Sequence, residues 1–293
     1  MQIKKSFIAK RSLGQNFLRD PKILKKIADF AQIGKEDTVV EVGPGDGTLT
    51  ELLLERVGKV IAIEKDGKLA GFLKEKFKNE ISNNKLEIIN EDILNYELRI
   101  KNYALVGNIP YYITGALFKK FLESENPPKS ITFVVQKEVA ERIMGGSHFA
   151  KASRDKKESI LSISIKAYGR PEYGGIIKAG SFYPKPKVDS AIIAVRNINK
   201  VKFAAQQKSF SSESPRTPSL RSARLSSENF FAERMLEQKF FGLLKMGFAH
   251  KRKLLIKNLG ANKDIFEKCG IPEKARAENL KVEGWICLTK ELV

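Results

Sequence analysis

The sequence predicts an α/β fold with a mostly parallel sheet, followed by a small all-α domain. From residue 38 onward, apolar runs of strand length alternate with amphipathic segments, which is typical of a sheet with helices on both faces. A glycine-rich turn separates the first of these strands from its helix. After about residue 199 the composition becomes serine-rich and then helical. A chain of 293 residues is long enough for one large and one small domain.

The expected elements follow in chain order. A helix is expected from Pro21, because Asp20 suits its N-cap and Gly34 suits its C-terminal stop. Strands are expected at 38–43, 59–66, 86–94, 103–108, 130–136 and 160–169, and the run 189–198 could close the sheet. Helices are expected at 47–57, 68–77, 116–123 and 137–143. Near the C-terminus, one helical face carries Phe241, Leu244, Phe248, Leu255 and Leu259.

The chain is strongly basic. Lysine and arginine number 53 against 34 acidic residues, which gives a net charge of +19. This balance favours a polyanionic partner, nucleic acid first and an acidic membrane surface second. No apolar run is long enough to span a bilayer, and no signal core opens the chain. We therefore expect a cytoplasmic protein with no membrane partner.

Cysteine and histidine are scarce. The two cysteines, Cys269 and Cys287, make a disulfide framework unexpected, so both are predicted to be free thiols in a reducing compartment. The two histidines, His148 and His250, are too few for a typical zinc site. No metal is expected.

A glycine loop follows the first strand of the alternating region. Gly43, Gly45 and Gly47 let the backbone approach a ligand, and the helix that follows attracts negative charge. Glu64 ends the second strand, where a carboxylate can accept hydrogen bonds from ribose hydroxyls. Asp92 follows the third strand and can accept one from an adenine amino group. This pattern indicates a bound nucleoside and leaves the ligand open between NAD and S-adenosylmethionine.

The fourth strand narrows the choice. It runs into Asn108-Ile109-Pro110-Tyr111, which resembles the [ND]-P-P-[YF] loop of methyltransferases that act on amino groups, with Ile in place of the first proline. The loop favours S-adenosyl-L-methionine as the cofactor.

The chain is similar to the ribosomal RNA adenine N6,N6-dimethyltransferase family nearly from end to end. The resemblance rests on "SLGQNFLRD", "VEVGPGDGTLT", "NEDIL", "NIPYYIT", "SFYPKPKVDSAII", "FFGLLKMGFAHKRKLL" and "KARAENL". It implies a Rossmann-like S-adenosylmethionine-dependent methyltransferase domain with a small all-α C-terminal domain. The implied boundaries are 1–199 for the catalytic domain with its basic N-terminal segment, 200–232 for a flexible serine-rich insertion or linker, and 233–293 for a helical RNA-binding domain.

The resemblance also implies roles for single residues. Those implied to bind the cofactor are Asn16 and Leu18 from the N-terminal segment, Gly43 and Gly45 at the methionine portion, Glu64 at the ribose, Asp92 and Ile93 at the adenine, and Asn108. The implied catalytic set is Asn108 and Pro110, with Tyr111 and Phe182 stacking on the target adenine. Candidate phosphate contacts are Lys4, Lys5, Lys10, Arg11, Arg252 and Lys253.

Two branches of the family share these motifs. One dimethylates two adjacent adenines near the 3′ end of small-subunit rRNA, and the other modifies a large-subunit adenine and confers macrolide resistance. "VVQKEVAERI", "RAENL" and Asp189 favour the small-subunit branch, with a monomer acting on the small ribosomal subunit or its precursor. The alternatives are the large-subunit enzyme and a non-catalytic RNA-binding assembly factor. Tyr112, where the branch usually has Asn, has no assigned role.

Overall fold

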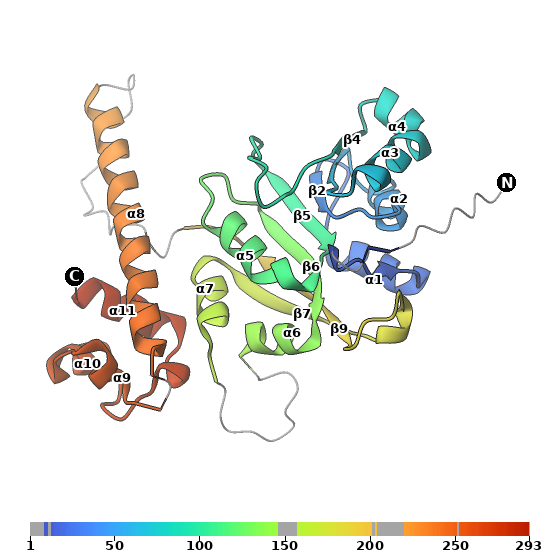
Figure 1. The fold of residues 1–293 in the computed structure, drawn as a ribbon. Coiled ribbons are helices and arrows are strands. Elements are labelled where there is room, and N and C mark those ends of the chain that lie inside the picture. Colours follow the sequence, from blue (N-terminus) through green and yellow to red (C-terminus); the bar gives the residue numbers. More distant parts are fainter. Residues whose placement is uncertain are drawn as a thin grey trace. The chain divides into compact units, whose positions relative to one another are not determined.

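The computed structural model describes residues 9–10, 13–145, 157–200, 203, 220–250 and 252–292, with side chains for all of these except 220–230. The chain divides into two compact units (Figure 1). The first comprises Met1–Met144 and Gly169–Ile198, and the second comprises Gly145–Tyr168 and Asn199–Val293. Residues 145–168, which the predicted boundaries place in the catalytic domain, therefore belong to the second unit.

A seven-stranded sheet forms the centre of the first unit, in the order β4-β3-β2-β5-β6-β9-β7. The parallel strands are β2 (Thr38–Val42), β3 (Lys59–Ile63), β4 (Leu86–Ile89), β5 (Tyr103–Asn108) and β6 (Ser130–Gln136). β9 (Ser190–Arg196) runs antiparallel between β6 and β7 (Arg170–Ile177). A separate antiparallel pair joins β1 (Phe17–Leu18) to β8 (Phe182–Tyr183).

Helices cover both faces of the sheet, as predicted. On one face, α1 (Pro21–Phe30), α2 (Thr48–Leu54) and α3 (Gly67–Lys76) contribute Leu24, Leu53 and Leu73 to a core cluster with residues of β2, β3 and β5. On the other face, Phe118 of α5 (Thr114–Leu122) meets Phe133 of β6 with ring centroids 5.5 Å apart. The remaining short elements are α4 (Lys78–Ser82), α6 (Lys137–Met144), η2 (Tyr111–Ile113) and η3 (Ala179–Ser181).

The start of α1 is as predicted and its end is not. The Asp20 carboxylate accepts hydrogen bonds from the backbone N–H groups of Lys22 and Ile23, which fixes the N-terminus at Pro21. The helix ends at Phe30, and Gln32 adopts the left-handed conformation (φ 53°) that Gly34 was expected to supply.

Two predictions for the last strands are wrong. The segment 160–169 is not a strand, because Ile160–Tyr168 forms helix α7 in the second unit. Its apolar residues fit both the two-residue period of a strand and the 3.6-residue period of a helix. Packing against α8 and α11 within that unit selects the helix. The strand at the sheet edge is β7, which sequence reasoning missed because Pro171 and a glycine pair at 174–175 interrupt its pattern. β9 consequently lies inside the sheet.

The second unit is helical. Its elements are α7, α8 (Leu220–Phe248), α9 (Leu255–Leu259), α10 (Lys263–Lys268), η5 (Ala277–Asn279) and α11 (Val282–Glu291). The predicted linker 200–232 overlaps α8, so its last part is helical rather than irregular. Its stretch 204–219 lies outside the described residues. The predicted continuous helical face is also divided, because α8 ends at Phe248 before α9 begins. Within the described residues, no helix is long and apolar enough to cross a membrane.

The prediction of free thiols is wrong for this structure. Cys269 follows α10 and Cys287 lies in α11, and the two form a disulfide with their Cα atoms 5.7 Å apart. The pairing needs no framework of several bridges, because the packing of α10 on α11 alone brings the two side chains together. Composition could not reveal this proximity.

Two glycines of α8 offer a matched test of this packing. A Cβ added at Gly247 would lie 2.3 Å from the buried Trp285 ring, whereas one at Gly242 would meet nothing within 4 Å. We expect Gly247→Ala to destabilise the second unit by about 1–3 kcal/mol through overpacking. Gly242→Ala should stabilise it by up to about 1 kcal/mol, since alanine favours the helix. Because Trp285 is the chain's only tryptophan, its fluorescence during denaturant unfolding reports on this unit. Equal stability of the two variants would contradict the packing.

Candidate active site

A pocket opens at the carboxyl ends of β2, β3 and β5, where the order of the strands reverses between β2 and β5. At this point Gly107 of β5 lies against β2, and a Cβ on it would fall 2.6 Å from the backbone oxygen of Val42. Ten of the predicted site residues line the pocket: Asn16, Leu18, Gly43, Gly45, Glu64, Asp92, Ile93, Asn108, Pro110 and Tyr111. They come from five separate segments of the chain.

The glycine loop between β2 and α2 depends on backbone freedom. Gly43, Gly45 and Gly47 all have positive φ, at 68°, 61° and 79°, a conformation that residues with a Cβ rarely adopt. A Cβ on Gly43 would meet only one atom, the Asn108 backbone oxygen at 4.0 Å, so this backbone borders open space in the pocket. The loop therefore forms a cradle, and at Gly43 a side chain would fill its open space.

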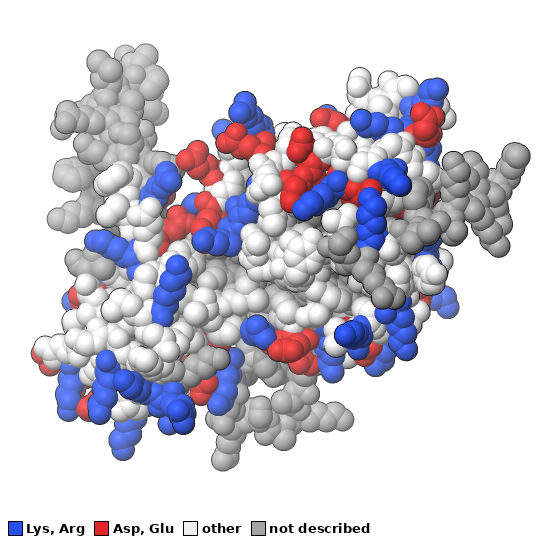
Figure 2. All heavy atoms as spheres, in the orientation of Figure 1, with Lys and Arg blue, Asp and Glu red and all other residues white. Residues whose placement is uncertain are grey.

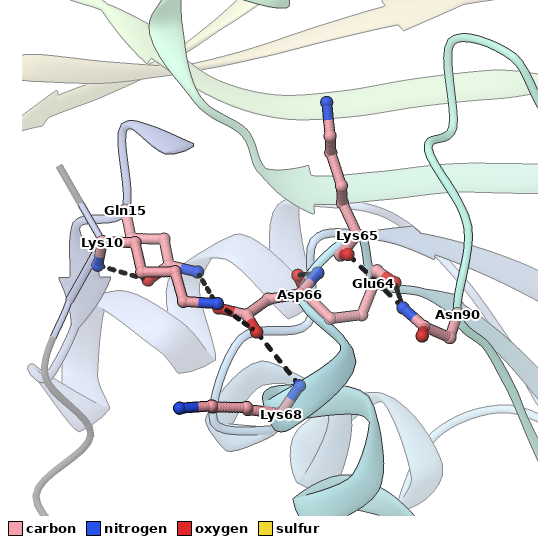
Figure 3. A network of polar contacts seen from close by, with 7 residues as sticks. All are labelled: Lys10, Gln15, Glu64, Lys65, Asp66, Lys68 and Asn90. Atoms are coloured by element: carbon pink, nitrogen blue, oxygen red, sulfur yellow. Dashed lines mark hydrogen bonds and ion pairs between the residues drawn. The ribbon is translucent and has the colours of Figure 1, made fainter. Parts of the chain in front are cut away.

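Glu64 lies just beyond the end of β3 with its carboxylate held in place. One oxygen accepts from the Gly45 backbone N–H at 3.1 Å. The other accepts from the Asp66 backbone N–H at 2.8 Å (Figure 3). The residue is 6% exposed, and this burial raises the pKa of its carboxyl. Each oxygen can still accept from a second donor, so the side chain suits a ribose diol.

Asp92 lies beyond β4 and also lines the pocket. Its carboxylate accepts from the Lys65 ammonium at 2.8 Å and from the Leu94 backbone N–H at 3.0 Å. The hydrogen bond from Lys65 is the main reason that the pKa of Asp92 lies below its usual range. The group is therefore ionised at neutral pH and is an acceptor for an exocyclic amine. Ile93, beside it, is buried and offers an apolar surface to an adenine ring.

Asn108 is the last residue of β5 and its amide orientation is set by the N-terminal segment. Its Nδ2 donates to the backbone oxygen of Asn16 at 2.9 Å. The amide oxygen is thereby turned away from that contact and remains an acceptor at the pocket wall. The bond joins two residues 92 positions apart, so the catalytic loop and the N-terminal segment form one wall.

Tyr111 begins the 3₁₀ turn after Pro110. Its hydroxyl lies 2.7 Å from the Ser190 Oγ at the start of β9, and its backbone oxygen accepts from Thr114 Oγ1 at 3.0 Å. These two contacts fix the ring at the edge of the pocket. Burial raises the pKa of the Tyr111 phenol, so the hydroxyl stays protonated and acts only as a hydrogen-bonding group.

Phe182 lies elsewhere. Its ring is 4% exposed and belongs to the core cluster that contains Leu18 and Leu24, and it does not line the pocket. In this structure Phe182 packs in the core, and stacking on a base would require the ring to leave it. The next residue, Tyr183, is 65% exposed.

Several pocket residues were not anticipated from the sequence. Phe17, between Asn16 and Leu18, lies so close to the glycine loop that a Cβ on Gly45 would meet its ring at 3.1 Å. Lys65 also lines the pocket, and its position directly after Glu64 is the one feature of the sequence that indicates this. Tyr112 also lines the pocket with 64% of its surface exposed, and its ring lies beside Gly14. Tyr112 is therefore a rim residue rather than part of the core.

The polar and apolar groups that line the pocket fit S-adenosyl-L-methionine. The glycine cradle leaves backbone space, Glu64 supplies acceptors for two hydroxyls, and Asp92 with Ile93 suits an adenine. When bound, the cofactor supplies an electrophilic methyl group on a sulfonium. Asn108 and Pro110 line the same pocket beside the glycine loop, where a nucleophile would have to enter.

Glu41, inside β2, is a buried carboxyl at the base of the pocket. It is 1% exposed and accepts a hydrogen bond from Thr50 Oγ1 at 2.7 Å. Burial raises the pKa of Glu41 from 4.5 to about 8, so the group is mainly protonated at neutral pH.

We expect Glu41 to make stability depend on pH. Because the native state holds a proton that the unfolded chain releases, its contribution to the free energy of unfolding falls as pH rises from about 4.5 to about 8. The slope is at most about 1.4 kcal/mol per pH unit. Glu41→Gln should remove this slope, and denaturant unfolding followed by circular dichroism at pH 5, 6, 7 and 8 measures it. Parallel curves for the two proteins would contradict the buried, protonated state.

Comparisons with known proteins identify the family. A model of the family "Ribosomal RNA adenine dimethylase" matches residues 6–212. The chain is 36% identical to the ribosomal RNA small subunit methyltransferase A of Dehalococcoides mccartyi, over 96% of this chain and 88% of that protein. Two solved structures, each 24% identical, share the fold over 94% of this chain. They are a dimethyladenosine transferase from Plasmodium falciparum (TM-score 0.69, 97% of that chain) and the 23S rRNA methyltransferase ErmE (TM-score 0.67, 99% of that chain).

The glycine cradle, the acids beyond β3 and β4 and the loop after β5 thus lie in one pocket of a chain that the family model matches over most of its length. The chain belongs to the ribosomal RNA adenine dimethylase family and is an S-adenosyl-L-methionine-dependent methyltransferase.

Proposed function

We propose that this enzyme dimethylates the N6 amino groups of two adjacent adenines near the 3′ end of small-subunit rRNA. It would act as a cytoplasmic monomer on the small ribosomal subunit or its precursor. The small-subunit target is supported by the relative from Dehalococcoides mccartyi, which is named a ribosomal RNA small subunit methyltransferase and aligns over nearly the whole chain. The observation that carries the chemistry is the orientation of the Asn108 side chain. Its Nδ2 donates to the Asn16 backbone oxygen, so its Oδ1 is left as an acceptor for the substrate.

The reaction needs a better nucleophile than free adenine. The lone pair of the N6 amine is delocalised into the ring, and acceptors aimed at its two hydrogens favour the pyramidal form in which the pair is localised. The Asn108 Oδ1 and a backbone carbonyl of the loop would be these acceptors, with Pro110 (φ −57°) limiting the loop's freedom. In-line transfer of the methyl group then depends mainly on positioning.

The target base has to leave its stack to reach this pocket. Tyr111, fixed through Ser190, would provide an aromatic face at the pocket edge. Base–aromatic stacking is worth on the order of 1–3 kcal/mol per base. Phe182 would join it only after a rearrangement of the β1–β8 pair that buries it.

Basic side chains of the second unit would bind the RNA backbone. Figure 2 shows lysine and arginine gathered over α9, α10 and α11, with fewer acidic side chains among them. The exposed basic residues of this surface are Arg252, Lys253, Lys257, Lys263, Lys268, Lys274, Arg276, Lys281 and Lys290. Such a surface contacts phosphates without reading sequence. Among the other predicted phosphate contacts, Lys4, Lys5 and Arg11 lie outside the described residues, and the Lys10 ammonium pairs with Asp66.

A labelling experiment tests the target. The protein is incubated with tritiated S-adenosylmethionine and either small or large ribosomal subunits that lack the modification, and the rRNA is digested and analysed for dimethyladenosine. We expect label in small-subunit RNA, two dimethyladenosines per subunit. Label confined to large-subunit RNA would establish the resistance-type activity instead. Cofactor binding with no label in either RNA would support the non-catalytic assembly factor.

Replacing Asn108 separates catalysis from cofactor binding. We expect Asn108→Ala to lower the rate of transfer by about 10²–10³-fold, because the amine loses an oriented acceptor. Cofactor affinity should change much less, since Glu64, Asp92 and the glycine loop are untouched. Single-turnover assays and equilibrium dialysis measure the two quantities. An equal loss of both would mean that Asn108 serves the cofactor alone.

A further inference from the structure

The N-terminal segment is a wall of the cofactor pocket with little regular structure of its own. Residues 13–18 all line the pocket, yet the only strand among them is the two-residue β1. Its fixed points are therefore tertiary. The β1–β8 pair holds its C-terminal end, and the Asn108–Asn16 hydrogen bond holds its middle. The N-terminal end is held by a third contact, to Asp66.

Asp66 is a nearly buried carboxylate at the start of α3. Its side chain is 3% exposed and is surrounded by donors (Figure 3). Its oxygens accept from the Lys10 ammonium at 2.8 Å, the Lys68 backbone N–H at 3.0 Å and Gln15 Nε2 at 3.3 Å. Burial alone would raise the pKa of Asp66, but these donors lower it below its usual range. The carboxylate is thus charged at neutral pH.

Lys10 and Gln15 also bind each other. The Lys10 backbone N–H donates to Gln15 Oε1 at 2.8 Å, and the Leu13 backbone N–H donates to the Lys10 oxygen at 3.0 Å. The Lys10 and Gln15 side chains thus reach Asp66 together, and each contact joins residues more than 50 positions apart in the sequence. Gln15 acts in this network both as a donor, to Asp66, and as an acceptor, from Lys10 (Figure 3).

The same network continues to the ribose position. The Asp66 backbone N–H donates to Glu64 Oε1, and Asn90 Nδ2 donates to the Glu64 backbone oxygen at 2.8 Å. A shift of Asp66 would therefore shift Glu64. Lys10 itself does not line the pocket, so any effect it has on the cofactor passes through Asp66 and the segment it anchors.

We propose that Lys10 and Gln15 are positioning residues that latch the N-terminal segment onto Asp66 as a strap across the cofactor pocket, and that cofactor exchange requires this latch to open. Each dimethylated adenine consumes two cofactor molecules, so the spent cofactor has to leave and be replaced within one modification. The Lys10 side chain is 44% exposed, so its contact with the buried Asp66 carboxylate is the part of the strap that solvent reaches and that can open most readily. The inference rests on the cofactor and not on the proposed RNA target.

Binding of S-adenosylhomocysteine to the full-length protein without RNA tests the latch. We expect Lys10→Met to raise its Kd about three- to tenfold, mainly through faster dissociation. Lys10→Arg should restore wild-type affinity, because it keeps the charge. Lys68→Met is the matched control, since Lys68 binds Asp66 through its backbone only and its ammonium lies apart from the carboxylate in Figure 3. It should bind like wild type.

Two further readouts separate a latch from a merely structural role. Raising the salt concentration should weaken binding by the wild type and Lys10→Arg and leave Lys10→Met unaffected, because only the first two hold an ion pair. Hydrogen exchange at the backbone amides of residues 13–18 should be faster in Lys10→Met.

The proposal is overturned if Lys10→Met binds S-adenosylhomocysteine as wild type does, or if Lys68→Met loses as much affinity. A loss in Lys10→Met that Lys10→Arg does not restore would also overturn it. Because no RNA is present in the binding experiments, failure of the small-subunit labelling would leave their outcome unchanged, and the two hypotheses fail separately.

Discussion

The close approach of β2 and β5 is the constraint on which the rest of the site depends. Gly107 lies so near the Val42 carbonyl that no Cβ fits between them. This contact sets the ends of two adjacent strands side by side, at the place where the strand order reverses. The glycine loop leaves one strand and the Asn108 loop leaves the other. A cofactor cradle and an amine-binding loop thus share a wall because two backbones meet.

Around this contact, the pocket is built from buried and half-buried polar groups with defined partners. Glu64 is held by two backbone N–H groups, Asp92 by Lys65 and Leu94, and Glu41 by Thr50. Buried polar groups are costly unless they are paired, so such a network specifies one arrangement strongly. The N-terminal segment is tied into the same network through Asp66, which makes a segment with little structure of its own part of the site.

Sequence reasoning succeeded where a short-range pattern fixes the local structure. The glycine loop, the acids at strand ends and the Asn108 loop each fall within a few residues of a buried strand, and parallel strands bring their carboxyl ends to one edge. It failed where two patterns compete. The run 160–169 fits a strand or a helix, and the glycine pair in β7 conceals an edge strand. The prediction of free cysteine thiols failed for another reason, because the disulfide depends on how the helices pack and not on the number of cysteines in the chain.

The sequence by itself determined the alternating fold, the cofactor class and the residues of the glycine loop, because these follow from local periodicity and from motifs contiguous in the chain. Only the tertiary structure decided how Asn108 is oriented, that Phe182 packs in the core, that Tyr112 lies on the rim, and that Lys10 reaches Asp66. Each of these depends on contacts between residues far apart in sequence, or on which side of a short strand faces the core. No local pattern carries that information.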